Sequence, residues 1–342
     1  MQKRSLILLA AATAVLVVLA VVALATGGYA VSHAGPNRRA FPGLADKVGR
    51  VASVAVRRAG LDLTFVRQGD AWFVQQNGGY PAARGKIRQI VLAVADMTLA
   101  EPMTRRPDLY SRLQVEDPGT GKGKSTLLTL KGKSGTVLAR LIVGKRRYDR
   151  LGAGDDGVYV RKPGDPQSWL ARGSLDFSDT PANWLDRGIV DLPDSRVAKV
   201  SLTQPDGSTL VLDRAGPKAK FAVVGAPANA KYKDETALGE PAMALESLDL
   251  DDVRPAAKLP VPASGVTTAS YTTFDGLRVD LKLFQHDNKD WIALAATGSG
   301  KTAPEATKID GRVSHWVYAI ASYKAKMMQT RLADLLASPK GS

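Results

Sequence analysis

The strongest constraint in this sequence is an apolar run near its start, from Ser5 to Thr26, which contains no charged residue. An α-helix of about twenty such residues, at roughly 1.5 Å per residue, matches the roughly 30 Å hydrocarbon core of a bilayer. Lys3 and Arg4 precede the run, and a basic N-terminal flank favours an N-inside orientation. The sequence therefore predicts a single-pass helix in the inner (cytoplasmic) membrane, with the body in the periplasm or otherwise outside the cytoplasm.

A cleaved signal peptide is the alternative interpretation of this run. Such peptides have an apolar core of roughly 7–15 residues followed by a cleavage site with small residues. The run from Ser5 to Thr26 is longer than that, although the small residues around Gly28 and Ala30 would allow cleavage. The length of the run favours a retained anchor.

Composition limits what the rest of the chain can be. With 342 residues, 44% of them hydrophobic, the chain is long enough for two packed domains. It has no cysteine, which excludes disulfides and thiolate chemistry. The formal net charge of +14 predicts attraction to anionic lipid, glycan or an acidic partner. Because no basic patch interleaved with aromatics on a known module is visible, nucleic acid is not an expected partner.

The chain after the anchor reads as a linker and then a pattern that occurs twice. Residues 27–50 are rich in small and polar residues at their start and predict a linker. From Val51, apolar and polar residues alternate as in strands, and a helical pattern follows over 84–99, with Ile87, Ile90, Val91, Val94 and Met97 on one face. The alternation restarts at Val197, an offset of 146 residues from Val51.

The recurrence predicts an α+β fold made of two tandem repeats, each an antiparallel-rich sheet with one main helix. The expected division is 1–26 for the cytoplasmic tip and anchor, 27–50 for the linker, 51–193 for the first repeat and 194–342 for the second. Helices are expected over 234–248 in the second repeat and from Ser322 to Ala337 at its end.

The bridge between the two patterns also supports a family resemblance. Its sequence is SDTPANWLDRGIVDLP, from Ser178 to Pro193, and it is followed by the V-x-x-V-x-L restart at Val197. Together with the meander and central helix before it, this resembles the bacterial family of domain of unknown function 4340, over about 51–337. The resemblance implies one membrane helix, an extracytoplasmic body and a role beside an ABC-type export system of the gliding-motility kind. It supplies no catalytic residues.

Two groups of residues are candidate contact sites. The basic run Lys145, Arg146 and Arg147, with Arg150 nearby, is the candidate contact for an anion or acidic partner, because arginine can bind carboxylate or phosphate bidentately. The alternative is a solvated loop. The second group comprises Trp184, Asp186 and Arg187 in the bridge, which are candidates for contact between the repeats.

No cofactor, metal or catalytic site is predicted. The segment Ala295–Thr302, AATGSGKT, follows a strand as a P-loop would, but no apolar helical face is evident after it. The three histidines do not have metal-ligand spacing, and no G-x-S-x-G nucleophile elbow occurs. A hydrolase whose triad assembles in space is left as a remote alternative.

The sequence thus leads to one expectation of function and one alternative. We expect a non-enzymatic, membrane-anchored accessory or scaffold subunit of an ABC-type export or envelope complex, with a transporter permease or envelope proteins as partners. The alternative is a binding module for an anionic envelope glycan or lipid.

Overall fold

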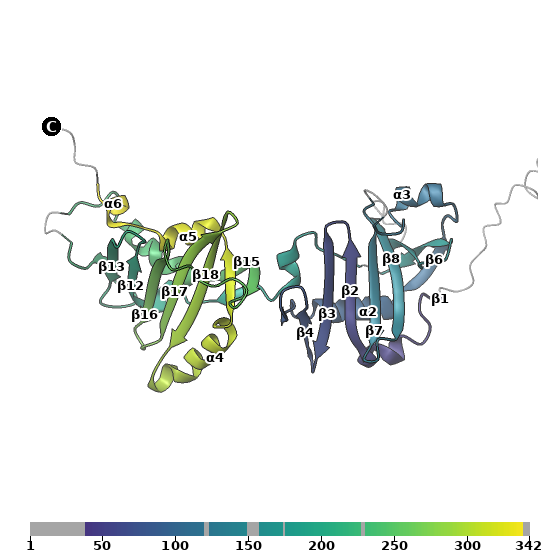
Figure 1. Ribbon diagram of the computed structural model, residues 1–342, viewed down its shortest axis with the longest axis horizontal. Coiled ribbons are helices and arrows are strands. Elements are labelled where there is room, and N and C mark those ends of the chain that lie inside the picture. The colour runs from purple at the N-terminus through teal and green to yellow at the C-terminus, as the bar shows by residue number, and fades with distance from the viewer. Residues whose placement is uncertain (1–37, 120–122, 149–156, 174, 227–229, 338–342) are drawn as a thin grey trace, which may run out of the picture.

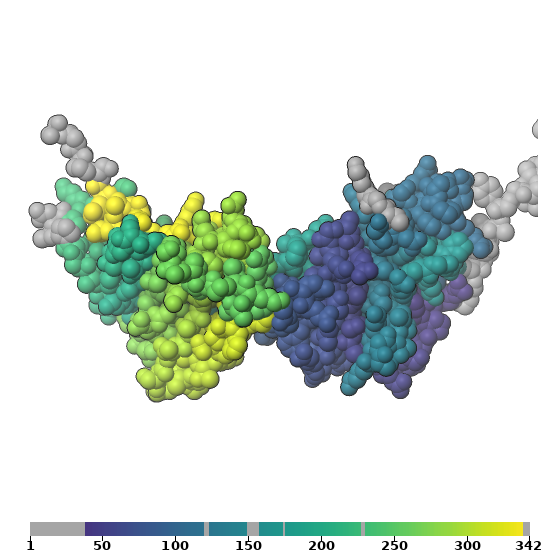
Figure 2. Space-filling view, viewed as in Figure 1, coloured from purple at the N-terminus to yellow at the C-terminus, as the bar shows by residue number. Residues whose placement is uncertain are grey.

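The computed structural model describes residues 38–119, 123–148, 157–173, 175–226 and 230–337. Within them the chain forms two antiparallel sheets that lie side by side in an elongated body (Figure 1). Figure 2 shows the two halves meeting at a narrower waist. The predicted anchor over 5–26 lies outside the described residues, and none of the described helices is long and apolar enough to cross a membrane.

The first sheet has ten described strands in the order β1-β6-β10-β9-β8-β7-β2-β3-β4-β5. The strands are β1 (Arg38–Arg39), β2 (Val51–Arg58), β3 (Leu61–Gln68), β4 (Ala71–Val74), β5 (Tyr80–Pro81), β6 (Thr98–Pro102), β7 (Thr126–Gly132), β8 (Val137–Arg147), β9 (Gly157–Arg161) and β10 (Ser168–Arg172). The helical segments of this half are η1 (Ala45–Arg50), α2 (Lys86–Asp96), η2 (Pro107–Leu109), α3 (Tyr110–Leu113) and η3 (Pro181–Trp184).

Helix α2 closes the core of the first sheet from behind (Figure 1). Four residues of the predicted apolar face, Ile87, Ile90, Val91 and Val94, are buried in this helix, and Met97 is buried just after the helix ends at Asp96. They pack with the inward side chains of the strands in one cluster, as the 3.6-residue period of a helix requires.

The second sheet has nine described strands in the order β11-β15-β19-β18-β17-β16-β12-β13-β14. The strands are β11 (Gly188–Val190), β12 (Val197–Thr203), β13 (Thr209–Asp213), β14 (Ala222–Val223), β15 (Leu248–Pro255), β16 (Thr267–Thr273), β17 (Arg278–His286), β18 (Lys289–Thr297) and β19 (Trp316–Ile320). The helical segments are η4 (Asp194–Arg196), η5 (Thr236–Leu245), η6 (Gly300–Thr302), α4 (Ala303–Val313), α5 (Ser322–Met328) and α6 (Leu332–Leu335).

The two strand orders correspond position by position. Reading from β1 and from β11, each strand of the second sheet has a counterpart in the first, in the same chain order, and β5 is the additional strand. Irregularities recur as well: the pairing of β2 with β7 shifts between Val51 and Ser53, and that of β12 with β16 shifts between Val197 and Lys199. The expected pair of antiparallel-rich sheets is therefore present.

Several element boundaries differ from the expectation. Residues 38–50, assigned to the linker from their composition, belong to the first sheet: β1 pairs with β6, and Ala40 and Leu44 are buried in the core. The second sheet begins before residue 194, because β11 pairs with β15. The helix predicted over 234–248 is the shorter 3₁₀ segment η5, which contains Pro241, a residue that removes a helical hydrogen bond.

The helical content of the second half is also more divided than expected. The helix predicted from Ser322 to Ala337 is interrupted between α5 and α6, where the Thr330 hydroxyl donates to the Met327 carbonyl. The second half also contains α4, which packs against β18 and was not predicted. It therefore has more than the one main helix expected for each repeat.

A short stretch of backbone joins the two sheets by pairing with both. Leu185 forms a bridge with Ala82 at the end of the first sheet, and the Asp186 amide donates to the Pro81 carbonyl. Immediately afterwards, β11 pairs with β15 of the second sheet. Because consecutive residues bind opposite partners, the sheets are held together by backbone hydrogen bonds as well as side chains.

Candidate functional site

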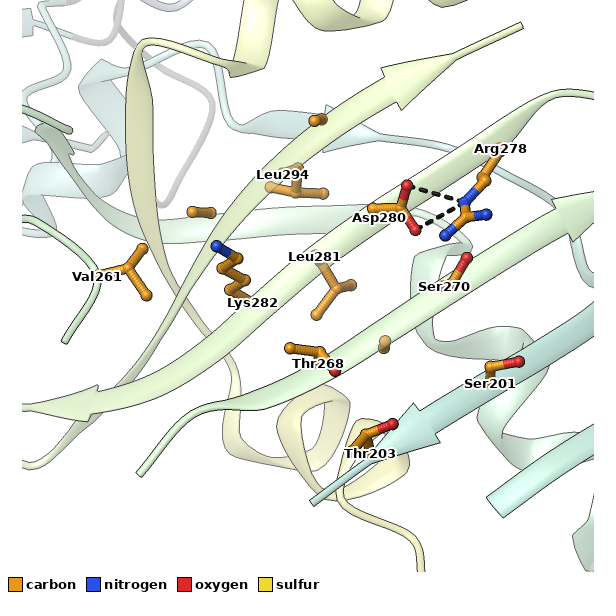
Figure 3. Close-up of a pocket in the computed structure, with 13 residues that line it drawn as sticks. Ser201, Thr203, Val261, Thr268, Ser270, Arg278, Asp280, Leu281, Lys282 and Leu294 are labelled. Atoms are coloured by element: carbon orange, nitrogen blue, oxygen red, sulfur yellow. Dashed lines mark hydrogen bonds and ion pairs between the residues drawn. The ribbon is translucent and has the colours of Figure 1, made fainter. Parts of the chain in front are cut away.

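The outer face of the second sheet carries an open groove of about 510 Å³. Strand residues alternate between faces, so Val279, Leu281 and Leu283 are buried in β17 while Arg278 and Lys282 are exposed. The groove runs over β12, β16, β17 and β18 on the exposed side (Figure 3).

Small side chains form the floor of this groove. In one row across the strands, Ser201 is opposite Ser270, Ser270 is opposite Asp280, and Asp280 is opposite Ala295. The next row is formed in the same way by Thr203, Thr268, Lys282 and Ala293. Because Ser, Thr and Ala project little from a sheet, the surface is shallow and remains open to solvent.

The connection from β15 to β16, residues 256–266, provides one wall of the groove. Its Leu259 is buried with Phe284, Trp291, Val317 and Ala319 in a second apolar cluster on this outer face. Val261 and Ala293 pack against that cluster and also line the groove. This connection is therefore held against the sheet by the cluster around the buried Trp291. It covers one part of the outer face and leaves the part with the groove open to solvent.

The charged side chains of the groove are partly neutralised. Arg278 Nε donates to both carboxylate oxygens of Asp280 at 2.9 Å, and Figure 3 shows this pair at one end of the groove. Lys282 extends over the floor on the other side of Leu281 (Figure 3). The arrangement offers hydroxyl groups, one cation and apolar contacts, which suit recognition of an extended segment.

The basic run predicted as an anion contact is part of a strand. Lys145, Arg146 and Arg147 lie at the end of β8, and not in a loop; Arg150 lies outside the described residues. Arg147 is 3.6 Å from Glu101, Arg146 lies over the Tyr148 ring and Lys145 near the Tyr159 ring. The three side chains therefore contact different neighbours, because successive residues of a strand point to opposite faces.

The three bridge residues have separate roles. Trp184 is fully buried in the core of the first sheet, beside Phe65 and Phe177, and its indole donates to the Ser178 carbonyl. The Asp186 carbonyl accepts a hydrogen bond from the Tyr80 hydroxyl at 3.1 Å, on the first sheet.

Arg187 instead contacts the second sheet. It lies 3.7 Å from Asp249 and 3.9 Å from Asp251 of β15, and its Nε donates to the Leu250 carbonyl. Asp186 and Arg187 therefore contact one sheet each, whereas Trp184 contributes to the core of one sheet.

The glycine-rich segment Ala295–Thr302 is followed by a helix, contrary to the sequence expectation. Helix α4 begins at Ala303; Pro304 is tolerated because the first turn of a helix has no internal partner for its N–H. The Thr302 amide and hydroxyl both donate to the Ser299 carbonyl, and β18 runs antiparallel to both neighbours. The loop thus uses its own donors to start the helix.

The titratable groups with perturbed pKa values lie outside the groove. Burial raises the pKa of Tyr80, at the junction between the sheets, to about 12. Burial lowers the pKa of Lys324, whose ammonium group donates to the Met243 and Glu246 carbonyls at the end of η5. The pKa of Lys86 is also lowered by burial. Among the described residues, no group of three or more His, Asp or Glu side chains could hold a metal ion.

The groove was not predicted from the sequence. Its signal was the alternation of Ser and Thr with apolar residues in VSLT and TTASYTT, which predicts strands but does not show that the polar faces of four strands lie together.

A family model matches residues 72–275 of the chain, well over half of it, and its description is Domain of unknown function (DUF4340). The match extends across parts of both sheets. No curated protein and no solved structure matches the chain.

Proposed function

Because the chain belongs to the family of the domain of unknown function DUF4340, we propose that it is a membrane-anchored accessory or scaffold subunit of an ABC-type export or envelope complex. In this proposal the run from Ser5 to Thr26 is the transmembrane anchor and the two sheets lie outside the cytoplasm. A transporter permease or an associated envelope protein is the partner.

The two sheets are, in the same proposal, copies of one ancestral unit. Equal strand order and the shared irregularities at Val51 and Val197 support this. A duplicated sheet provides two similar outer faces, and they can diverge to contact different partners.

The observation that carries the accessory role is the open groove on the second sheet. Its floor extends across four strands and its Arg278–Asp280 pair is internally satisfied. An open surface with hydroxyl groups and an apolar wall suits a segment of a partner protein, whereas small-molecule sites generally enclose most of the ligand. We assign the groove as the docking surface for an extracytoplasmic segment of the transporter.

A site-specific cross-link tests this assignment. The chain has no cysteine, so Thr268→Cys creates a unique attachment point on the groove floor for a photoactivatable thiol reagent. Lys218→Cys, in the exposed turn after β13, is the matched control. We expect the full-length Thr268→Cys protein in its native membrane to cross-link to a transporter subunit, identified by mass spectrometry, and the Lys218→Cys protein not to do so. Equal cross-linking at both positions, or none, would contradict the role of the groove.

A second candidate function, binding of an anionic envelope ligand, is favoured by the distribution of charge. Residues 38–193 contain 26 Lys and Arg against 16 Asp and Glu, a net charge of +10, whereas residues 194–342 contain 19 against 17, a net charge of +2. The positive charge is therefore concentrated in the half of the body that follows the apolar run in the chain. Such a field attracts anionic ligands.

A further inference from the structure

In the second sheet, an arginine just before the first long strand is neutralised by two carboxylates. Arg196 is the last residue of η4; its guanidinium donates to both oxygens of Glu305, at 2.8 and 2.9 Å, and to Asp275 at 2.9 Å. Asp275 lies in the turn between β16 and β17 and Glu305 in the first turn of α4. These bonds raise the pKa of Arg196 and lower that of Glu305.

Arg50 occupies the same place in the first sheet. It is the last residue of η1 and precedes Val51, as Arg196 precedes Val197. The neighbouring turns also have the same hydrogen bonds: Gly132 and Gly135 repeat the backbone pattern of Thr273 and Gly276. Gly135 and Gly276 both have positive φ. Arg50 therefore lies beside the β7–β8 turn, with which it lines one pocket, as Arg196 lies beside the β16–β17 turn. The β7–β8 turn is at the lower end of the first sheet in Figure 1.

In the described part of the chain, the surroundings of Arg50 lack the two carboxylates that neutralise Arg196. The turn position of Asp275 is taken by Ser134 in the first sheet, and the described connection between β9 and β10, residues 162–167, contains no helix to supply a counterpart of Glu305. Arg50 instead lines an open pocket of about 580 Å³ together with Lys47, Lys133, Ser134 and Thr136. None of the described residues that line this pocket is acidic.

We propose that this pocket binds the phosphate group of a ligand, which takes the place that Glu305 and Asp275 have beside Arg196. Three cations suit a phosphate better than a single carboxylate, and arginine can bind its oxygens bidentately. The Ser134 and Thr136 hydroxyls share a hydrogen bond of 2.8 Å, which leaves one of the two hydroxyl protons as an additional donor at the same rim. Asp46 is the adjacent acidic residue in η1 but does not line the pocket.

The pocket would be the binding site in the second candidate function, the binding of an anionic envelope ligand, and the source of the phosphate rests on that function. The pocket is formed by η1, a few residues after the start of the described chain at Arg38. The residues 27–37 that precede Arg38 span at most about 40 Å when extended. If the anchor is in the membrane, the headgroup of an anionic phospholipid is therefore within reach of the pocket.

Amide hydrogen exchange on the full chain tests both the site and the source. The protein is placed in nanodiscs of neutral phosphatidylcholine, and exchange is followed in residues 47–50 and 132–136 during titration with inorganic phosphate, at constant ionic strength kept with chloride. A second arm without added phosphate compares nanodiscs that contain phosphatidylglycerol. We expect protection of both segments by phosphate, and by phosphatidylglycerol if the ligand is a lipid headgroup.

Three variants separate the pocket from general charge effects. Arg50→Ala removes the central cation, and we expect it to weaken phosphate binding roughly tenfold or more, since bonds to charged groups are worth about 1.5–3 kcal/mol. Arg112→Ala, an exposed residue of α3 that does not line the pocket, removes the same charge at the opposite end of the first sheet (Figure 1). It should leave the affinity within about twofold, because it is a remote surface charge.

Ser134→Asp is the third variant and reproduces the arrangement of the second sheet. It places a carboxylate where Asp275 lies relative to Arg196, so we expect it to abolish protection by phosphate. It should also raise the melting temperature without phosphate, which shows that the variant is folded.

The outcomes are distinguishable. Equal weakening by Arg50→Ala and Arg112→Ala, or phosphate protection that survives Ser134→Asp, would overturn the pocket while leaving general anion binding intact. Absence of protection by phosphate and by phosphatidylglycerol would overturn both the pocket and the second candidate function.

Discussion

Gly78 of the first sheet lies against Pro255 of the second so closely that a Cβ atom on Gly78 would be 2.5 Å from the Pro255 Cγ atom. Gly78 also has a φ of +69°, in the left-handed region. Gly78 thus reaches the junction by its backbone, and the neighbouring Asn77 side chain in the turn between β4 and β5 donates to the Val253 carbonyl. The junction between the sheets depends on a residue without a side chain.

Gly78→Ala should therefore destabilise the junction. A positive φ costs a residue with a side chain about 1 kcal/mol, and the clash with a rigid proline ring adds to this cost. We expect a loss of roughly 2–3 kcal/mol in the free energy of unfolding, measured by chemical denaturation.

Gly79→Ala is the matched control for this prediction. Gly79 also has a positive φ, of +83°, but no heavy atom lies within 4 Å of its Cβ position. It should lose only the conformational part, about 1 kcal/mol. If the two variants are equally stable, the contact with Pro255 has no energetic weight.

The ring of Tyr80 meets that of Trp316 edge to face across the same junction. Their centroids are 5.0 Å apart with an interplanar angle of 89°. Such pairs are worth about 0.5–1.5 kcal/mol beyond the area they bury. A double-mutant cycle with Tyr80→Ala and Trp316→Ala should give a coupling energy in that range, and a coupling near zero would mean that the two sheets are held by the backbone pairing at Leu185 and β11.

Arg196 and Arg50 should differ in their effect on stability. Arg196→Met leaves Glu305 and Asp275 close together without a cation, and we expect a loss of about 1 kcal/mol because the network is bidentate but partly exposed. Arg50→Met should stay within about 0.5 kcal/mol, as is usual for surface substitutions. Thermal unfolding of both full-length variants in detergent without phosphate compares them, and similar losses would contradict the internal comparison between the two sheets.

The same network predicts a pH dependence. The hydrogen bond from Arg196 lowers the pKa of Glu305 from its ordinary 4.5; the Thr273 hydroxyl and then Arg196 lower the pKa of Asp275 from 3.8. Both carboxyl groups have lower pKa values in the folded protein than in the unfolded chain, so the unfolded state binds protons more readily. The stability that the Arg196 network contributes is therefore present above about pH 5 and is lost as the pH falls through the lowered pKa values.

Melting temperatures between pH 3 and pH 7 check this dependence. We expect the difference between the original protein and Arg196→Met to be largest near neutral pH and to shrink toward pH 3. A difference that is constant over this range would show that the lost contacts of Arg196 are not those with ionised carboxylates.

Local sequence patterns predicted much of the fold because they report which face of an element is buried. The buried residues Ile87, Ile90, Val91 and Val94 of α2 recur at helical spacing. The alternation that starts at Val51 and Val197 marks the corresponding strands. The patterns are weaker where an element has few apolar residues. Strand β15, with the sequence LDLDDVRP, has three aspartates, although Leu248, Leu250 and Val253 are buried.

The helix α4 was missed for a similar reason. Only Ala306 and Val313 of its residues are buried, so no apolar face is evident, and its start is fixed by the Thr302 bonds to Ser299. The linker prediction over residues 38–50 failed because β1 is only two residues long, which is too short to show a periodic pattern, and its pairing with the distant β6 is not visible in the local sequence.

The sequence by itself determined the apolar run at the start, the two sets of alternating strands, the excess of positive charge before residue 194 and the absence of cysteine. Only the tertiary structure decided which charges are neutralised and which line a pocket. Arg196 meets Glu305 across 109 positions of sequence, while Arg50 meets Lys133 and Ser134 at the corresponding place. Periodicity reports the environment of neighbouring residues, whereas pairing of distant charges depends on how strands align, and that alignment exists only in the folded chain.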